Sequence, residues 1–235
     1  MAKIYLMGND HRDWQNGPRK LEAAYTRLNP NIVVSEYDFV SYSGLERICD
    51  EFSAQLDKIS NDKSGKEKVR GMFELVAYGF PLGFNRKYAA QNGIYHVFAD
   101  LPHAHSGNCQ TISGLGEMIL ALISSHNGEI EENAFKAMEL MKDRPPTQEY
   151  LQNVWEYYMR TENSLSNELK LFKLRLAGLI GKRDAHMETM IRAIYPRGGI
   201  IVYPVGFVHL QDSILKSTLY SRIKDLNPER IPILG

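Results

Sequence analysis

The sequence predicts an α/β protein with a central, largely parallel sheet, helices on its faces and a helical insertion. Three observations support this fold class. The chain opens with a strand, helix, strand pattern, a similar apolar strand precedes the C-terminal segment, and residues from about 110 to 195 are mostly helical in pattern. Parallel neighbouring strands need a crossover connection, which is usually a helix. We expect residues 1–235 to form one domain, with the insertion at about 110–195.

The opening unit is defined by its apolar pattern. Residues 3–7, KIYLM, form an apolar run that ends at Gly8, which predicts a buried strand followed by a loop. Residues 17–29 then carry a proline in a first helical turn and apolar residues on one helical face. The β-branched run at 32–38, IVVSEYD, predicts a second strand with Glu36 at or just beyond its carboxyl end.

The middle of the chain alternates between helical and loop patterns. We expect a helix near 43–59, a flexible polar loop at 60–70, and a helix that is interrupted near residues 78–84 by a proline and two glycines. The segment IYHVFADLP at 94–102 predicts a third strand, with Asp100 at its exit.

The last part returns from helix to strand. The helical pattern breaks at KDRPPT, residues 142–147, because adjacent prolines end a helix. A strand is predicted at 198–206, then a helix at about 211–224 and a short terminal piece at 230–235.

Composition limits the function classes. The 28 basic residues are balanced by 28 acidic ones without a long run of either sign, which argues against a nucleic-acid or membrane-surface partner. Only two cysteines, Cys49 and Cys109, are present, and neither a signal peptide nor an apolar stretch of about 18 residues is recognisable. We therefore expect a cytoplasmic protein that acts on a small-molecule or peptide substrate, and we leave its oligomeric state open.

A GxxH motif occurs twice, as Gly8 to His11 and as Gly206 to His209. Each copy follows a predicted strand and precedes a predicted helix. We expect each glycine to give its tight turn backbone freedom and so to bring its histidine over the carboxyl edge of the sheet, where open α/β folds bind ligands.

Five segments of the chain resemble the TraB, PrgY, GumN and Tiki superfamily, which is related to erythromycin esterases and ChaN-like proteins. They are GNDH at 8–11, PNIVVSEYD at 30–38, GIYHVFADLP at 93–102, GKRDAHM at 181–187 and VGFVH at 205–209. The resemblance implies a metallopeptidase-like hydrolase in which His11, Glu36 and His209 are metal ligands and catalytic residues, with Arg183 as a further catalytic residue. The chain departs from the commoner pattern at Asn9, Asp10, Phe207 and Val208, where bulkier side chains could alter access to the site.

Two imidazoles and one carboxylate, with a water at an open position, suit a divalent metal ion such as Zn, Mn or Co. Such an ion lowers the pKa of its bound water toward about 7 and so makes hydroxide available. Arg183 would then stabilise the oxyanion that forms when hydroxide attacks a carbonyl group. The expected activity is hydrolysis of peptide, amide or ester bonds.

Two other functions stay open. In a metal-free esterase, one histidine would deprotonate water while Glu36 orients it. A non-catalytic protein would instead bind or sequester a peptide or a metal complex.

Further polar residues are candidates for supporting roles. Asp100 either caps a turn or orients a histidine, and Asp10 is an extra ligand, an acceptor or a solvated residue. Asp184 is a possible supporting residue that could equally form an ion pair with Arg183 on a charged helix face. The loop containing His103, His105 and Cys109 gathers ligand types, but it matches no recognised zinc spacing.

Overall fold

The computed structural model describes residues 1–11, 13, 16–102, 104–125, 147–160, 166, 168–170, 172 and 181–233. Its centre is a five-stranded sheet in which every pairing is parallel and the strand order is β3-β2-β4-β1-β5. The strands are β1 (Lys3–Asn9), β2 (Ile32–Ser35), β3 (Tyr95–Phe98), β4 (Ile200–Gly206) and β5 (Glu229–Pro232). The predicted α/β class is confirmed, and the terminal piece supplies an edge strand, β5, that was not expected.

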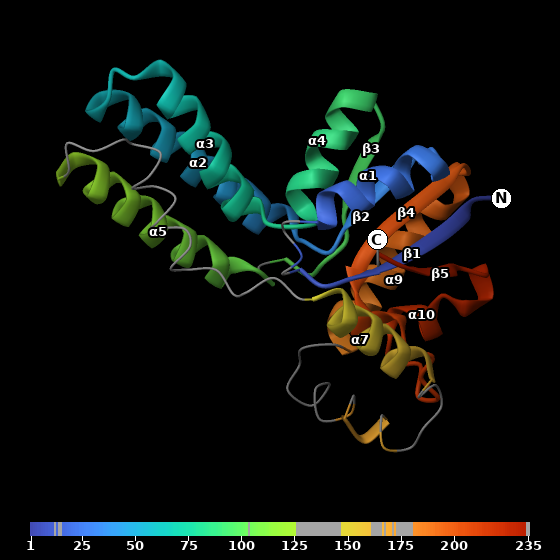
Figure 1. Ribbon diagram of the computed structural model, residues 1–235. Helices are drawn as coiled ribbons and strands as arrows, with labels where there is room; N and C mark the ends of the chain where they lie inside the picture. Colours follow the sequence, from blue (N-terminus) through green and yellow to red (C-terminus); the bar gives the residue numbers. More distant parts are fainter. Residues whose placement is uncertain are drawn as a thin grey trace. The chain divides into compact units, whose positions relative to one another are not determined.

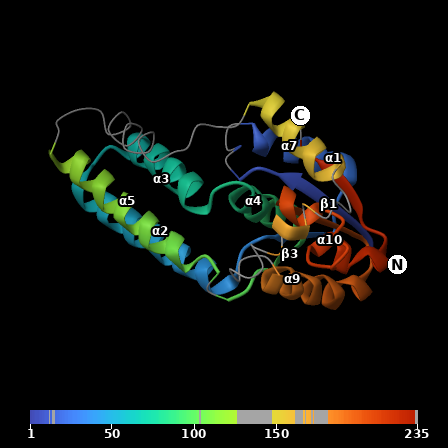
Figure 2. The same ribbon diagram turned by 90° about the horizontal axis from the view of Figure 1, so that it is seen from below.

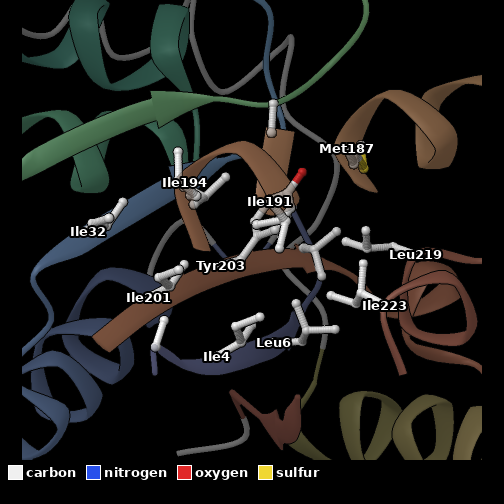
Figure 3. Packing of buried hydrophobic residues seen from close by; sticks show 14 of the residues in the cluster. Ile4, Leu6, Ile32, Met187, Ile191, Ile194, Ile201, Tyr203, Leu219 and Ile223 are labelled. Carbon is white, nitrogen blue, oxygen red and sulfur yellow. The ribbon is translucent and has the colours of Figure 1, made fainter. Parts of the chain in front are cut away.

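Helices cover both faces of the sheet (Figure 1). On one face, α1 (Gly17–Leu28) and α4 (Leu82–Asn92) bury apolar residues against the sheet, among them Leu21, Tyr25 and Ala89. On the other face, α9 (Gly181–Ile194) and α10 (Leu219–Arg222) pack on the strands, and α7 (Gln148–Arg160) adds Trp155 and Met159. Figure 3 shows this second core, in which Met187, Ile191 and Ile194 meet Ile4, Leu6, Ile32, Ile201 and Tyr203.

The register between β1 and β4 places the two GxxH motifs side by side, offset by one residue. Gly8 is paired with Val205, and Asn9 is paired with Gly206. The chain leaves β1 toward His11 and leaves β4 into the 3₁₀ turn η2 (Phe207–Leu210), which carries His209. Because neighbouring parallel strands end at the same edge, both histidines emerge at the carboxyl edge of the sheet.

The chain divides into two compact units. The sheet unit comprises residues 1–37, 80–101 and 145–235, and the helical unit comprises residues 38–79 and 102–144.

In the helical unit, α2 (Phe39–Ile59), α3 (Lys63–Tyr78) and α5 (Ser106–Ser125) lie side by side (Figure 2). The rings of Phe52 and Phe73 stack with centroids 4.0 Å apart, and Gly116 of α5 lies against both rings.

The predicted insertion at 110–195 does not match either unit. α5 packs with α2 in the helical unit, whereas α7 and α9 bury apolar residues in the core of the sheet unit. The apolar surface that each helix covers therefore determines the unit to which it belongs. Residues 126–146 and most of 161–180, which also belong to the predicted insertion, lie outside the described residues.

The predicted loop at 60–70 is mostly helix, because α3 begins at Lys63. The Asp62 side chain accepts a hydrogen bond from the Gly65 N–H at 3.1 Å, which caps the first turn, and Val69 is fully buried. The polar composition of residues 60–70 indicated a loop. The cap at Asp62 and the buried face of α3 nevertheless stabilise a helix there.

The predicted helix at 211–224 is reduced to the short helix α10. Lys216 has a φ of 47°, which belongs to the left-handed region and interrupts a right-handed helix. Thr218 then starts the helix anew by accepting a hydrogen bond from the Ser221 N–H. Among the helices that the structure describes, none is long and apolar enough to span a membrane.

Candidate functional site

The carboxylate of Glu36 is the centre of the candidate site. Glu36 follows β2 directly and is 8% exposed. Its Oε1 accepts hydrogen bonds from Arg183 Nη2 at 2.7 Å and from His209 Nε2 at 3.1 Å. Its Oε2 accepts a hydrogen bond from the Gly206 N–H at 2.9 Å and lies 3.3 Å from His11 Nε2. Burial opposes ionisation, but positive His209 and the hydrogen bonds from both histidines hold the pKa of Glu36 well below its usual value.

His209 lies between two carboxylates. Its side chain is only 3% exposed, its Nδ1 forms a short hydrogen bond with Asp184 Oδ1, and its Nε2 donates to Glu36. Burial alone would lower the pKa of His209, but the charges of Asp184 and Glu36 overcome it and raise the pKa to about 10. His209 is therefore an imidazolium at neutral pH that donates from both ring nitrogens.

His11 contacts the carboxylate of Glu36 and is exposed to solvent. Its side chain is 49% exposed, and its Nε2 lies 3.3 Å from Glu36 Oε2, the one carboxylate contact recorded for it within the described part of the chain. Partial burial lowers the pKa of His11 and the positive His209 does the same, but the hydrogen bond and the charge of Glu36 outweigh them, so the pKa is raised. His11 is thus a titratable imidazole that is exposed to solvent.

Asp100 holds Arg183. The Nε of Arg183 donates to Asp100 Oδ1 at 2.9 Å and to Oδ2 at 3.0 Å, and Nη2 also donates to Oδ2. Asp100 is itself fixed by the Leu101 N–H at 2.8 Å. Of the two roles expected for Asp100, the hydrogen bond from Leu101 supports turn capping. The arginine that α9 presents to Asp100 was not expected. Asp184, the next residue on α9, binds His209.

Arg183 keeps donors available beside Glu36. Its recorded hydrogen bonds all use Nε and Nη2, and the Arg183 side chain is 22% exposed. A guanidinium has five N–H donors, two of them on Nη1. Among the described residues Nη1 has no partner, and it is not one of the buried unpartnered atoms. These donors are thus accessible to a ligand.

Asp10 and Asp13, which flank His11, have different roles. Asp10 is half-buried, and its charge contributes to raising the pKa of His11. Asp13 is buried and forms an ion pair with Lys20 Nζ at 3.0 Å. The structure thus records Asp10 as an electrostatic neighbour of His11.

The suspected ligand loop belongs to the helical unit. The backbone N–H of His105 donates to Asp38 Oδ2 at 3.3 Å, and Cys109 Sγ lies 3.5 Å from the carbonyl oxygen of Ser41. These contacts tie the loop to the start of α2. His103 lies outside the described residues.

The two motif glycines are needed for space. Neither has a positive φ, and that of Gly206 is −57°, so the expectation of backbone freedom is wrong. A Cβ on Gly8 would lie 2.7 Å from Leu210 Cδ1 and from Phe207 Cδ1. Phe207 thus packs into the first motif, and its ring also meets that of Trp155 at 6.1 Å. Phe207 is buried there.

A buried hydrogen-bond network fixes the end of β2 next to Glu36. Ser35 Oγ lies 2.8 Å from His96 Nε2 and accepts from Asn85 Nδ2 at 2.9 Å, and Asn85 Oδ1 accepts from Tyr25 at 2.6 Å. Burial lowers the pKa of His96 to about 4, and the charge of Arg86 contributes. His96 is thus neutral at physiological pH and hydrogen-bonded within the sheet.

Sequence reasoning missed two buried polar side chains. The Tyr203 hydroxyl has no partner among the described residues, and burial, together with the charges of Glu36, Asp100 and Asp184, raises its pKa far above the usual value. The amide of Asn9 is also buried without a partner in the described part of the chain. The only signal was polarity within apolar strands, and this did not reveal which charged groups lie nearby.

The residue types at the site are those of a metal site, but their arrangement fits a bound metal ion poorly. Two imidazole nitrogens face one carboxylate, and Asp184 supports His209 as an outer carboxylate does in many metal sites. However, both Glu36 oxygens already face two nitrogen groups each, and His209 holds a proton at the nitrogen that would bind the ion. Within the described residues, no three His, Cys, Asp or Glu side chains are grouped to hold a metal ion. The divalent metal site stays a prediction.

Comparisons with protein families, with curated proteins and with solved structures found no match for this chain. The resemblance to the TraB and Tiki superfamily therefore depends on the five sequence segments alone.

Proposed function

We propose that the protein is a hydrolase of peptide, amide or ester bonds in which His11 activates a water molecule beside Glu36. One observation carries this proposal. An ionised carboxylate is held at the sheet edge by three donors and contacts one accessible imidazole, that of His11. Such a carboxylate and imidazole pair is the arrangement that general-base catalysis needs.

The reaction would proceed in two proton transfers. Neutral His11 accepts a proton from water through Nε2 while Glu36 Oε2 orients that water, and the hydroxide oxygen bonds to the substrate carbonyl carbon. The Nη1 donors of Arg183 stabilise the resulting oxyanion. The His11 imidazolium then returns its proton to the leaving amine or alcohol as the carbonyl re-forms. Atoms and charges balance without another reactant.

In this mechanism His209 positions Glu36 and does not accept the proton. Asp184 and Glu36 engage both of its ring nitrogens, and its side chain is 3% exposed. A buried cation at this place keeps Glu36 ionised and restricts its rotation. The two motif histidines are thus unequal in this proposal.

Metal-dependent hydrolysis is the second candidate, favoured by the approach of both Nε2 atoms to the same carboxylate. His11, His209 and Glu36 would hold a Zn, Mn or Co ion, which would supply hydroxide near neutral pH. His209 would first have to lose its proton, and Glu36 would have to release some of its present donors.

The test combines metal analysis with hydrolysis assays on a panel of aryl esters, aryl amides and peptides. We expect turnover that survives chelation and falls by about 10²- to 10⁴-fold in His11→Gln. His186→Gln is the matched control, because His186 is a half-buried histidine on α9 for which no contact within the site is recorded.

Other outcomes contradict the metal-free mechanism. Stoichiometric metal together with loss of turnover on chelation would support the metal-dependent mechanism. Bound peptide or metal without turnover of any substrate would support a sequestering protein.

A further inference from the structure

An unfilled space beside Gly206 is surrounded by the reactive groups of the site. A Cβ at this position would lie 3.6 Å from Glu36 Oε2, 3.6 Å from His209 Cδ2 and 3.7 Å from His11 Nε2. These are ordinary van der Waals distances, and among the described residues no other non-neighbouring atom is closer. The space is therefore at least as large as a methyl group, and both imidazoles and the carboxylate border it.

Nothing in the local backbone requires a glycine at this position. The φ of −57° and ψ of 143° at Gly206 are open to any residue. The N–H group that binds Glu36 at 2.9 Å belongs to the main chain, so other residues would also supply it. Gly8 differs, because a Cβ there would overlap the side chains of Leu210 and Phe207.

We propose that the space beside Gly206 is the binding position of the nucleophilic water. This inference rests on the proposed hydrolase function. A water oxygen in this space can reach Glu36 Oε2, to which it donates, and His11 Nε2, which accepts its second proton. The position thus offers the polar partners that an ordered water needs, and it joins the base to the orienting carboxylate. Gly206 serves the reaction by having no side chain, whereas Gly8 serves packing.

Gly206→Ala tests this assignment, because its methyl group would fill the space at the water position without overlapping any atom of the described residues. We expect the variant to unfold within a few degrees of the wild-type temperature, and to lose at least about 100-fold in turnover, the lower end of what a general base contributes. Gly114→Ala in α5 is the matched control, because an added Cβ there would meet no described atom within 4 Å. It should keep wild-type turnover. Wild-type turnover in Gly206→Ala would overturn the proposal.

Crystal structures provide a readout that does not depend on turnover. We expect the wild type to show an ordered water within roughly 3.2 Å of both His11 Nε2 and Glu36 Oε2, and Gly206→Ala to lack it. If no substrate is turned over but this water is present, the hydrolase proposal fails while the water position stands. An empty space, or a metal ion there, in wild-type crystals would overturn the water position itself, even if Gly206→Ala fails to fold.

Discussion

The two GxxH turns share a motif and an edge of the sheet, but their surroundings are opposite. The His11 side chain is 49% exposed, whereas that of His209 is 3% exposed. Gly8 has no room for a Cβ, whereas Gly206 has room for one. A repeated motif therefore indicates a shared location and does not establish a shared role.

The difference between the histidines comes mainly from a second carboxylate. Both rings approach Glu36, but only His209 also binds Asp184, which α9 supplies from the face of the sheet. A buried imidazole between two carboxylates remains charged, whereas an exposed imidazole with one such contact can exchange its proton with solvent. The predictions below test this contrast.

The largest effect is expected from Asp184→Ala. It removes one partner of a buried ion pair and should lower the free energy of unfolding by about 3–5 kcal/mol. Asp10→Ala, the corresponding change beside the exposed His11, should cost less than about 1 kcal/mol. Urea denaturation of both variants measures the difference, and equal losses would contradict the contrast between the two turns.

His96 shows what burial does to a histidine whose ring bonds a hydroxyl, that of Ser35, instead of a carboxylate. Its pKa of about 4 in the folded state lies below the unfolded value of 6.5, so the unfolded chain binds the proton first as the pH falls. Stability should therefore be lost between pH 6.5 and 4, by about 3 kcal/mol at pH 4 from this group.

The control for this pH effect is His96→Gln, which removes the titrating group and keeps an acceptor for Ser35. Its free energy of unfolding should fall less steeply than that of the wild type over the same pH range. Parallel curves for the two proteins would show that His96 does not carry the effect.

Gly8→Ala should cost about 1–3 kcal/mol, because its methyl group overpacks the contact with Phe207 and Leu210. Denaturant midpoints measure this loss. Gly8→Ala combined with Phe207→Leu should recover part of it, since the smaller side chain makes room, and the absence of any recovery would count against this packing role.

The smallest effect on stability is expected from His11→Gln, below about 1 kcal/mol because the side chain is half exposed. In the wild type, hydrolysis should increase with pH through a pKa above 6.5, since His11 must be neutral to accept the proton and Glu36 raises its pKa. A pH–rate profile that is flat from pH 6 to 8 would exclude His11 as the base.

Local patterns in the sequence were sufficient to place the principal site residues. The alternation of apolar runs and turns located β1, β2 and β4, and their parallel pairing predicted that His11, Glu36 and His209 would meet at one edge. Both histidines do approach Glu36.

The partners of Asp100 and Asp184 could not be predicted in the same way. They depend on how α9 is rotated about its axis on the sheet, so that Arg183 faces Asp100 while Asp184 faces His209. The sequence also could not show why position 8 is a glycine, because the atoms that exclude a Cβ there belong to Phe207 and Leu210, which are distant in the chain. Tertiary packing determines these features, and no local pattern encodes them.

The central claim is that His209 is a fixed cation and His11 an exchangeable base around the same carboxylate. An NMR titration of the imidazole resonances, assigned with His11→Gln and His209→Gln, tests it most directly. We expect His11 to titrate above pH 6.5 and His209 to stay protonated up to about pH 10. A neutral His209 at pH 7, or two histidines with the same pKa, would contradict the account.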